Sequence, residues 1–471
     1  MAARSPAKIL KWFGIGVLAL IIIAALILTF SKDARQAAEI EALDTMGDLA
    51  VQRMKDSGAA EGGVAADFIN IPIEARKIAD GVYQATGVAN AQLVTTGAGA
   101  VLFDTGLVTQ APKQMKALRA AVPDLKLSHI ILSHSHADHA GGTKVWLKDG
   151  VEIITHDQFA EEQRYLTELQ PYFWHRNRTL FPFMPENPPT FGMMAYGGIK
   201  PTQTVANGEP HSFSQGGVDF ELMALPGAEG ADNLVLWLPQ KRILLSGDFF
   251  GPIYPQFPNI FTMRGEKIRK PVEYIHSLDA IIALKPRMIV PSHKQPIADE
   301  AAIMAGLIKM RDATRFVHDA TVKGMNDGKT VERLMTEIQL PPELALSQQH
   351  GRVSWAVKSI WEYYATWFHF DKTTELYPVP ASDVYTDIVE AAGADALTSK
   401  AKDHLAKNQP VHALHLVDIV LGKEGADKAA LQVRKDALGL LLAQAEGGLQ
   451  NSYEIYWLTY RLRDTEERLA R

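Results

Sequence analysis

Three histidines and one aspartate fall within six positions of the sequence, in the stretch ILSHSHADHAGG at residues 131–142. The four side chains are His134, His136, Asp138 and His139. On a tight loop the two alternate histidines can bind one metal ion, and the adjacent aspartate and histidine can bind a second. Each set is incomplete and leaves room for a water, whose pKa metal ions lower from about 15.7 to about 7. The cluster therefore predicts a two-metal site that activates water for hydrolysis.

Other polar candidates follow apolar runs with the composition of β-strands. Asp104 follows AVLF, Asp248 follows RILLSG and His293 follows RMIVPS. Such runs alternate with helical stretches such as APKQMKALRAAV from about residue 76 to 296, which predicts a layered α/β domain. Loops at strand ends are where a layered α/β fold places its site. We therefore expect these side chains to lie near the histidine cluster.

Beyond about residue 297 the β-type runs disappear. In PVHALHLVDIVLG, apolar residues recur at helical spacing, and DKAALQVRKDALGLLLAQA follows as a second amphipathic segment. We expect the last 170 or so residues to form an all-helical region.

The composition narrows the chemistry of the site. The net charge of -6 provides no basic field for nucleic acid, so nucleic acid is not an expected partner. The sequence has no cysteine, which excludes disulfides, thiolate ligands and a cysteine nucleophile. Any metal must be held by imidazole and carboxylate groups.

The N-terminal segment contains an uncharged apolar run, WFGIGVLALIIIAALILTF, at residues 12–30. A helix of that length spans a bilayer core. Arg4, Lys8 and Lys11 precede it, so we expect an inner-membrane anchor with a cytoplasmic N-terminus and a periplasmic catalytic domain. Two alternatives stay open. A cleaved signal peptide would release the protein to the periplasm, and a buried core helix fits the terminal position least well.

The motif HxHxDHxGG after a strand, with VLFDTG upstream, resembles the metallo-β-lactamase fold, an αββα sandwich of hydrolases. In most members a histidine lies in a PGH turn, whereas this chain reads LPGAEGADN. That departure is similar to the zinc alkylsulfatases, where a glutamate replaces the histidine, and it implies Glu229 as a ligand. His156, His175 and His211 are the less favoured alternatives for this role.

The resemblance implies roles for the strand-end residues as well. Asp104 would support the metal loop without binding metal, Asp248 would bridge two Zn²⁺ ions, and His293 would complete the second ion site. The alkylsulfatases usually have glutamate at the bridging position. The first ion would then be held by His134, His136 and Glu229, and the second by Asp138, His139 and His293.

The stretch NIFTMRG at residues 259–265 resembles the alkylsulfatase segment that holds the sulfate group. Arg264 can form two parallel hydrogen bonds to an oxyanion, and Asn259 can donate another. Two features depart from the family. His350 stands where tyrosine is usual, and the resemblance does not extend to the sterol-carrier-like C-terminal domain that is common there.

The resemblance extends from about residue 75 to 471 and gives a domain organisation. Residues 1–32 are expected to be a membrane anchor or uncleaved signal, and residues 33–75 a linker with a helical segment. Residues 76–299 would form the catalytic domain, and residues 300–471 a helical dimerisation domain that makes the protein a homodimer.

The expected function is that of a dizinc hydrolase of sulfate esters, with alkyl sulfates as substrates and metal-bound hydroxide as the nucleophile. One alternative is a hydrolase of the same fold that acts on another ester, a phosphoester or a lactam. A second is a non-catalytic, membrane-tethered dimeric scaffold. All seven predicted ligand positions carry side chains that can bind metal, which disfavours the scaffold.

Overall fold

A computed structural model describes residues 31–56, 71–181, 184–190, 192–422 and 425–471. The apolar run predicted to anchor the protein, residues 12–30, lies outside the described residues. Among the helices that are described, none is both long and apolar enough to cross a membrane.

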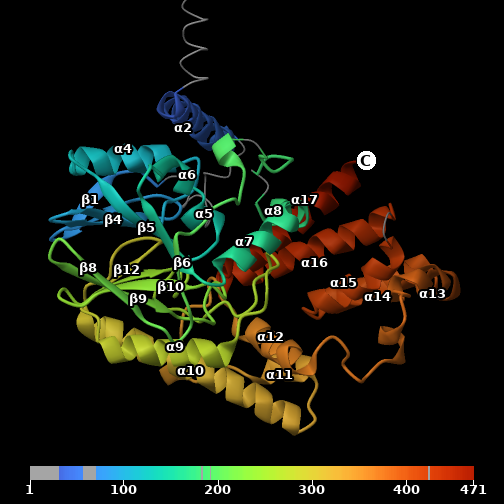
Figure 1. Cartoon of the computed structure of the whole chain (residues 1–471). Coiled ribbons are helices and arrows are strands. Elements are labelled where there is room, and N and C mark those ends of the chain that lie inside the picture. The colour runs from blue at the N-terminus through green and yellow to red at the C-terminus, as the bar shows by residue number, and fades with distance from the viewer. Residues whose placement is uncertain (1–30, 57–70, 182–183, 191, 423–424) are drawn as a thin grey trace, which may run out of the picture.

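Two mixed sheets face each other in the first part of the chain (Figure 1). Within the described residues, the first sheet has seven strands in the order β1 (Ala75–Ala79), β2 (Val82–Ala85), β3 (Ala91–Thr96), β4 (Gly99–Phe103), β5 (Leu127–Ile131), β6 (Glu152–His156) and β7 (Gln203–Val205). The second has five there, in the order β12 (Met288–Pro291), β11 (Ile243–Gly247), β10 (Leu234–Leu238), β9 (Val218–Ala224) and β8 (His211–Gln215).

Strands β4 to β7 run parallel, as do β11 and β12, while the other neighbouring strands are antiparallel. Parallel neighbours bring their carboxyl ends to one edge of the sheet. The loops after β4, β5, β11 and β12 can therefore converge on one site.

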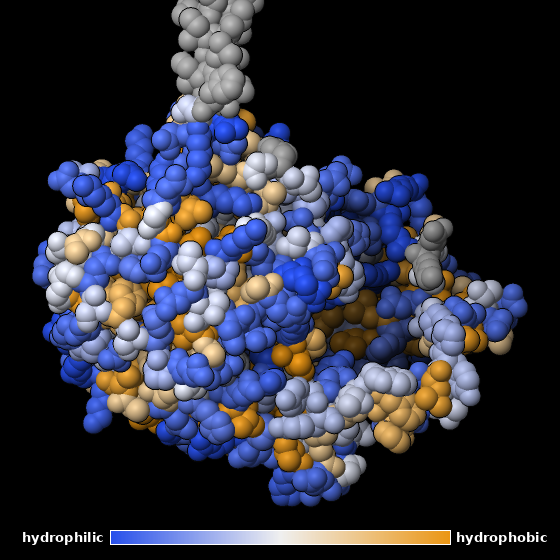
Figure 2. Space-filling model, viewed as in Figure 1, coloured by the Kyte–Doolittle hydropathy of each residue, from blue (hydrophilic) through white to orange (hydrophobic). Residues whose placement is uncertain are grey.

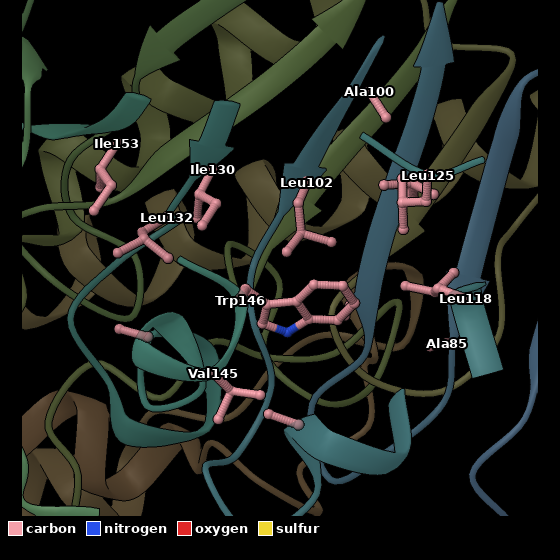
Figure 3. Packing of buried hydrophobic residues seen from close by; sticks show 14 of the residues in the cluster. Ala85, Ala100, Leu102, Leu118, Leu125, Ile130, Leu132, Val145, Trp146 and Ile153 are labelled. Carbon is pink, nitrogen blue, oxygen red and sulfur yellow. The ribbon is translucent and has the colours of Figure 1, made fainter. Parts of the chain in front are cut away.

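Side chains along each strand alternate between the two faces of the sheet, and this alternation supplies two separate cores. In β4, Val101 and Phe103 pack into the core between the two sheets, whereas Leu102 faces the opposite way, toward the covering helices. That outer core also contains Trp146, whose indole nitrogen donates to the carbonyl of Thr105 at 3.2 Å (Figure 3). The outer layer over the first sheet contains α2 (Lys32–Asp56), α4 (Ala111–Ala121) and α6 (Thr143–Trp146).

The second sheet is covered on its outer face by α9 (Pro271–Leu284) and α10 (Glu300–Asn326). Buried side chains of both helices, including Leu278 and Leu307, pack against Val235 and Leu244 of the sheet. Two sheets with helices outside each make the predicted αββα sandwich, and that prediction is confirmed.

The region after α10 is helical in the part that the structure describes, as predicted. Its helices are α11 (Val331–Glu337), α12 (Val353–Ala365), α13 (Tyr385–Ala392), α14 (Ala394–Ala406), α15 (Pro410–Leu421), α16 (Lys428–Gly447) and α17 (Ser452–Ala470). In α15, Ala413, Val417 and Leu421 are buried at the helical spacing expected from the sequence. Two further helices, α7 (Phe159–Glu168) and α8 (Gln170–Leu180), lie between the first sheet and α17 (Figure 1).

The surface is not uniform. Figure 2 shows a hollow where α12, α14 and α16 lie in Figure 1, with hydrophobic side chains in its wall. The segment between α12 and α13 also exposes several large hydrophobic side chains, namely Trp367, Phe370, Leu376, Tyr377 and Val379.

Candidate metal centre and anion-binding loop

The predicted metal loop lies at the carboxyl end of β5. His134 and His136 follow the strand, and Asp138 and His139 lie in the one-turn helix α5 (Ala137–Ala140). Gly247, at the end of β11, has a φ of +55°, and a Cβ there would lie 2.5 Å from Cβ of Ser133. A glycine is therefore required for β11 to approach the metal loop so closely.

Two groups of side chains are arranged closely enough to hold metal. Asp138, His139 and His293 form one, and His134, His139 and Asp248 form the other. Nε2 of His139 lies 3.3 Å from Asp248 and 3.5 Å from Asp138, and Nε2 of His293 lies 3.0 Å from Asp248. The structure thus brings these predicted ligands together from the loops after β5, β11 and β12.

Asp104 holds the metal loop in place through hydrogen bonds. Its carboxylate accepts hydrogen bonds from the backbone N–H of Ser133 and the hydroxyls of Ser133 and Ser292, each at 2.8 Å, and from Nδ1 of His139 at 2.9 Å. Nδ1 of His134 can donate to the Ser133 hydroxyl at 2.9 Å. Both histidines then carry their proton on Nδ1 and leave Nε2 free to bind metal. Asp104 itself has a φ of 59°, a left-handed conformation that aspartate tolerates better than most residues.

His293 is oriented in a similar way. Its Nδ1 lies 2.5 Å from the carbonyl of Val88, to which it can donate, so that Nε2 faces Asp248. The backbone carbonyl here has the role that Asp104 has for His139, because either acceptor fixes the tautomer of the ring.

The chemistry of these side chains fits a metal centre. In the part of the chain that the structure describes, Nε2 of His134, Nε2 of His139 and Oδ1 of Asp248 are buried without a hydrogen-bond partner. Leaving a buried polar atom unsatisfied costs about 1–3 kcal/mol, which a bound cation would remove. Burial also lowers the pKa of His134 well below its ordinary value, which keeps the ring neutral and able to bind metal.

Glu229, the predicted third ligand of the first ion, lies in a different electrostatic setting. Its carboxylate oxygens lie 2.5 Å from Arg269, 3.7 Å from Arg264 and 3.6 Å from Nε2 of His350. Burial alone would raise its pKa, but the charge of Arg269, with His350 and Arg264, lowers it to about 2. The structure places this carboxylate with the arginines, and it is not part of either group of candidate ligands.

His136 is paired instead with Glu266, whose Oε1 lies 3.3 Å from its Nε2. Oε1 of Glu266 also lies 3.2 Å from Arg264, and its Oε2 lies 3.1 Å from Arg269. Burial opposes the ionisation of Glu266, yet Arg264, His136 and Arg269 outweigh it and hold its pKa well below the ordinary value.

The predicted sulfate ligands lie in the same neighbourhood, in residues 259–269, which we call the anion loop. Arg269 donates to the carbonyl of Asn259 at 2.6 Å and so ties the two ends of this loop together. The side-chain amide nitrogen of Asn259 and Nε of Arg264 are buried donors for which the described residues offer no acceptor. A bound oxyanion would satisfy both donors.

The C-terminal helix also reaches this loop. Tyr453, in the first turn of α17, is buried, and its ring centroid lies 5.3 Å from that of His350. Burial raises the pKa of Tyr453, and its hydroxyl interacts with Arg264 and Thr262. The helical region therefore contributes to the wall of the site.

Four side chains of the site are absent from the sequence prediction: Asp232, Glu266, Arg269 and Tyr453. Glu266 and Arg269 directly follow the NIFTMRG stretch, so charged residues beside that motif were an available signal. Asp232 lies three positions after Glu229, and burial together with nearby Glu162 raises its pKa to about 7. Tyr453 had no such signal, because it lies on an amphipathic helix far along the chain.

Both the sandwich and the helical region of the chain are similar to known protein families. Residues 85–293 match the metallo-beta-lactamase superfamily, and residues 330–461 match the alkyl sulfatase dimerisation family. A linear primary-alkylsulfatase of a Pseudomonas species is 27% identical over 366 residues, which cover 71% of this chain and 67% of that protein. The alkyl/aryl-sulfatase BDS1 of Saccharomyces cerevisiae is 26% identical over 406 residues, covering 80% of this chain and 62% of that protein.

The fold is similar to that of a solved structure, the stereoselective inverting sec-alkylsulfatase Pisa1 from Pseudomonas sp.. The TM-score is 0.71 at 21% identity, and the match covers 85% of this chain and 66% of that one. The chain thus spans about three fifths to two thirds of the length of these relatives. The protein therefore combines a metallo-beta-lactamase superfamily domain, at residues 85–293, with an alkyl sulfatase dimerisation domain at residues 330–461.

Proposed function

We propose that the protein is a zinc-dependent hydrolase of sulfate esters, with alkyl sulfates as substrates. The observation that carries this proposal is the pair of buried, unsatisfied donors on Asn259 and Arg264 beside the candidate metal centre. Arg264 is linked to that centre through Glu266, which lies 3.2 Å from Arg264 and 3.3 Å from His136. The similarity to alkylsulfatases in both domains supports sulfate as the group that these donors bind.

The proposed ligands are divided between two ions. His134, His136 and Glu229 would hold the first ion, Asp138, His139 and His293 would hold the second, and Asp248 would be shared. Ligands of nitrogen and oxygen without thiolate suit Zn²⁺ in a hydrolytic site. When bound, the two ions would supply an activated water at neutral pH.

The protein's own side chains then bind and orient the substrate. Arg264 and Asn259 donate to the sulfate oxygens, and the fixed charge of Arg264 stabilises the second negative charge that develops as sulfate leaves. The reaction consumes one water and yields an alcohol, inorganic sulfate and a proton. Asp104 and the carbonyl of Val88 hold the histidine rings in place throughout.

The test is sulfate release from alkyl sulfates of several chain lengths by the Zn²⁺-loaded protein in ¹⁸O water. Label in the alcohol means attack at carbon, and label in the sulfate means attack at sulfur. We expect Arg264→Ala to lower kcat/KM at least about 100-fold, since oxyanion donors are worth roughly that much. Arg333→Ala, at an exposed arginine of α11, is the matched control and should retain activity.

Two outcomes would overturn the proposal. Turnover of phosphoesters, lactones or β-lactams without turnover of sulfate esters would assign the fold another substrate. A purified protein that holds no metal by elemental analysis would favour a scaffold.

We also propose that the protein is a homodimer through its helical region. The match of residues 330–461 to the alkyl sulfatase dimerisation family supports this. The exposed side chains of Trp367, Phe370 and Tyr377 add support, because grouped apolar residues at a surface mark contact sites. Light scattering should give twice the mass of the chain, and a monomer at micromolar concentration would contradict the proposal.

The membrane anchor at residues 12–30 is proposed from the sequence alone. Protease added to cells with a permeabilised outer membrane should then digest the catalytic domain and leave the N-terminus protected. Recovery of the full-length protein in the soluble fraction would contradict an anchor.

A further inference from the structure

A cavity of about 220 Å³ adjoins the candidate metal centre. It lies between residues 226–232 and residues 266–270, and we call it the side cavity. Two of the carboxylates that line it, those of Glu229 and Glu266, also lie 3.7 Å and 3.2 Å from Arg264. An ester whose sulfate group is bound by Arg264 would therefore have the side cavity next to it.

A second cavity beside the anion loop is too small for the rest of an ester. Asn259, Phe249 and Arg269 are among the residues that line it, and its volume is about 10 Å³. A single water needs about as much space. Of the two cavities, only the side cavity has room for the organic group of a substrate.

The lining of the side cavity does not suit a plain alkyl chain. Among the described residues that line it, Ile268 is the one large aliphatic side chain. Carboxylates outnumber lysines and arginines in the same lining. Pockets for apolar ligands are lined mainly by aliphatic and aromatic side chains, with few polar groups. The side cavity is therefore suited to an organic group that carries a polar substituent.

Asp232 differs from the other charged groups of the lining because it has no partner of opposite charge among the described residues. Lys267 lies 2.7 Å from Glu162. Lys270 lies 2.8 Å from Glu273, and the other two carboxylates have the arginine partners described above. Asp232 is only 1% exposed, and neither of its carboxylate oxygens has a hydrogen-bond partner in the described part of the chain.

The burial of Asp232 makes a bound donor favourable. A Cβ at Gly230 would lie 2.4 Å from Oδ1 of Asp232, so glycine at this position leaves the space that the carboxylate occupies. Burial and the charge of Glu162 raise the pKa of Asp232 to about 7, and Ser135 and His136 offset this only in part. An N–H or O–H group of a ligand would supply the hydrogen bonds that the described residues do not.

We propose that the side cavity binds a hydroxyl or ammonium group on the organic part of the ester, with Asp232 as the hydrogen-bond acceptor. The inference rests on the proposed hydrolysis of sulfate esters and names the class of alkyl sulfate, one whose chain carries a hydrogen-bond donor. Arg264 then binds the anionic end of the substrate, and Asp232 binds the other polar end. Asp232 determines specificity in this assignment and takes no part in the cleavage.

The test compares kcat/KM for three sulfate esters of equal length: butyl sulfate, and hydroxypropyl and aminopropyl sulfate with the polar group at the far end of the chain. Shorter and longer sets of the same kind cover other distances. At the length that reaches Asp232, we expect the Zn²⁺-loaded protein to prefer the hydroxyl or the amino ester over the plain alkyl ester at least about ten-fold, since a hydrogen bond to a charged group is worth that much. The better of the two polar esters shows which donor the side cavity takes.

Two variants show whether Asp232 is the acceptor. Asp232→Ala removes the acceptor, and the preference should fall at least about ten-fold. Asp232→Asn keeps an acceptor oxygen but no charge, so it should retain part of a preference for the hydroxyl ester and lose a preference for the amino ester. Glu273→Gln, at a carboxylate of the same lining that is paired with Lys270, is the matched control and should leave the preference unchanged.

The alcohol products give a second measurement that does not depend on a variant. A diol or an amino alcohol should inhibit the wild-type protein at lower concentrations than a plain alcohol of the same length. Thermal unfolding shows whether each variant is folded.

Equal kcat/KM for the three kinds of ester at every length, or a preference that a folded Asp232→Ala leaves unchanged, would overturn the inference. Failure of the proposed function would look different. In that case the wild-type protein would release no sulfate from any of the esters, butyl sulfate included.

Discussion

The candidate site has two halves that are built in different ways. One half, with Asp138, His139, Asp248 and His293, lies at the ends of strands and is supported by Asp104. The other half comes from the anion loop and the helical region, where two carboxylates, two arginines, His350 and Tyr453 meet. The first half has few possible arrangements because the sheet fixes the backbone. In the second half, each charged group has several possible partners of opposite charge. Only the distances between the groups show which of them form pairs.

The largest expected effect is in the strand-end half. Asp248 lies within 3.3 Å of His139 and His293 and belongs to a candidate ligand group. Asp248→Ala should lower kcat/KM for alkyl sulfates at least about 1000-fold, because in the proposed function the activated water would depend on metals that this carboxylate helps to hold. Steady-state sulfate release measures the effect, and activity within ten-fold of wild type would show that this half is not the reactive centre.

A somewhat smaller effect is expected from a change at Asp104, which supports the strand-end half of the site. Asp104→Asn would turn an NH₂ group either toward the backbone N–H of Ser133 or toward the hydroxyls of Ser133 and Ser292 and Nδ1 of His139, all of which now donate to Asp104. We expect zinc affinity to fall about 10- to 100-fold, measured by competition with a chelator. Ser292→Ala removes only one donor and should lose much less, and equal losses in the two variants would argue against a central role for Asp104.

In the other half, a smaller effect is expected from removing the hydroxyl that the helical region contributes. Tyr453→Phe keeps the ring beside His350 but removes the hydroxyl that interacts with Arg264 and Thr262. We expect kcat/KM to fall about five- to ten-fold, the worth of one hydrogen bond of about 1 kcal/mol. Tyr460→Phe, on the same helix and stacked on Trp457, is the control and should retain wild-type activity.

The smallest effect is expected at a histidine between carboxylates outside the site. His369 lies between Glu375, at 2.8 Å, and Glu362, at 3.1 Å, and hydrogen bonds to both raise its pKa. Since the folded-state pKa is raised, the stabilisation is complete below the unfolded value of about 6.5 and is lost as pH rises through the folded value.

His369→Gln should therefore lower the free energy of unfolding at pH 6 by less than about 1 kcal/mol, because solvent screens this pair, and should have no effect at pH 9. Chemical denaturation at the two pH values measures the difference. A loss of equal size at both would mean that packing, and not charge, accounts for the role of His369.

The sequence by itself determined the features that depend on local pattern. Strand-like runs followed by polar residues located Asp104, Asp248 and His293, and the HxHxDH motif located four more candidates on one loop. The structure brings most of them together because parallel strands end at one edge of the sheet. Helical spacing likewise predicted α15 and α16, since periodicity along one element requires no knowledge of its partners.

Only the tertiary structure decided which charged groups meet in the anion loop. Glu229 and Glu266 are 37 residues apart and share Arg269, while Tyr453 reaches the same place from α17. Each carboxylate faces a histidine and both arginines, and no local pattern in the sequence shows which histidine that is. These pairings depend on the distances between elements that are far apart in the chain. Those distances are fixed only when the sheets, the loop and the helical region pack together.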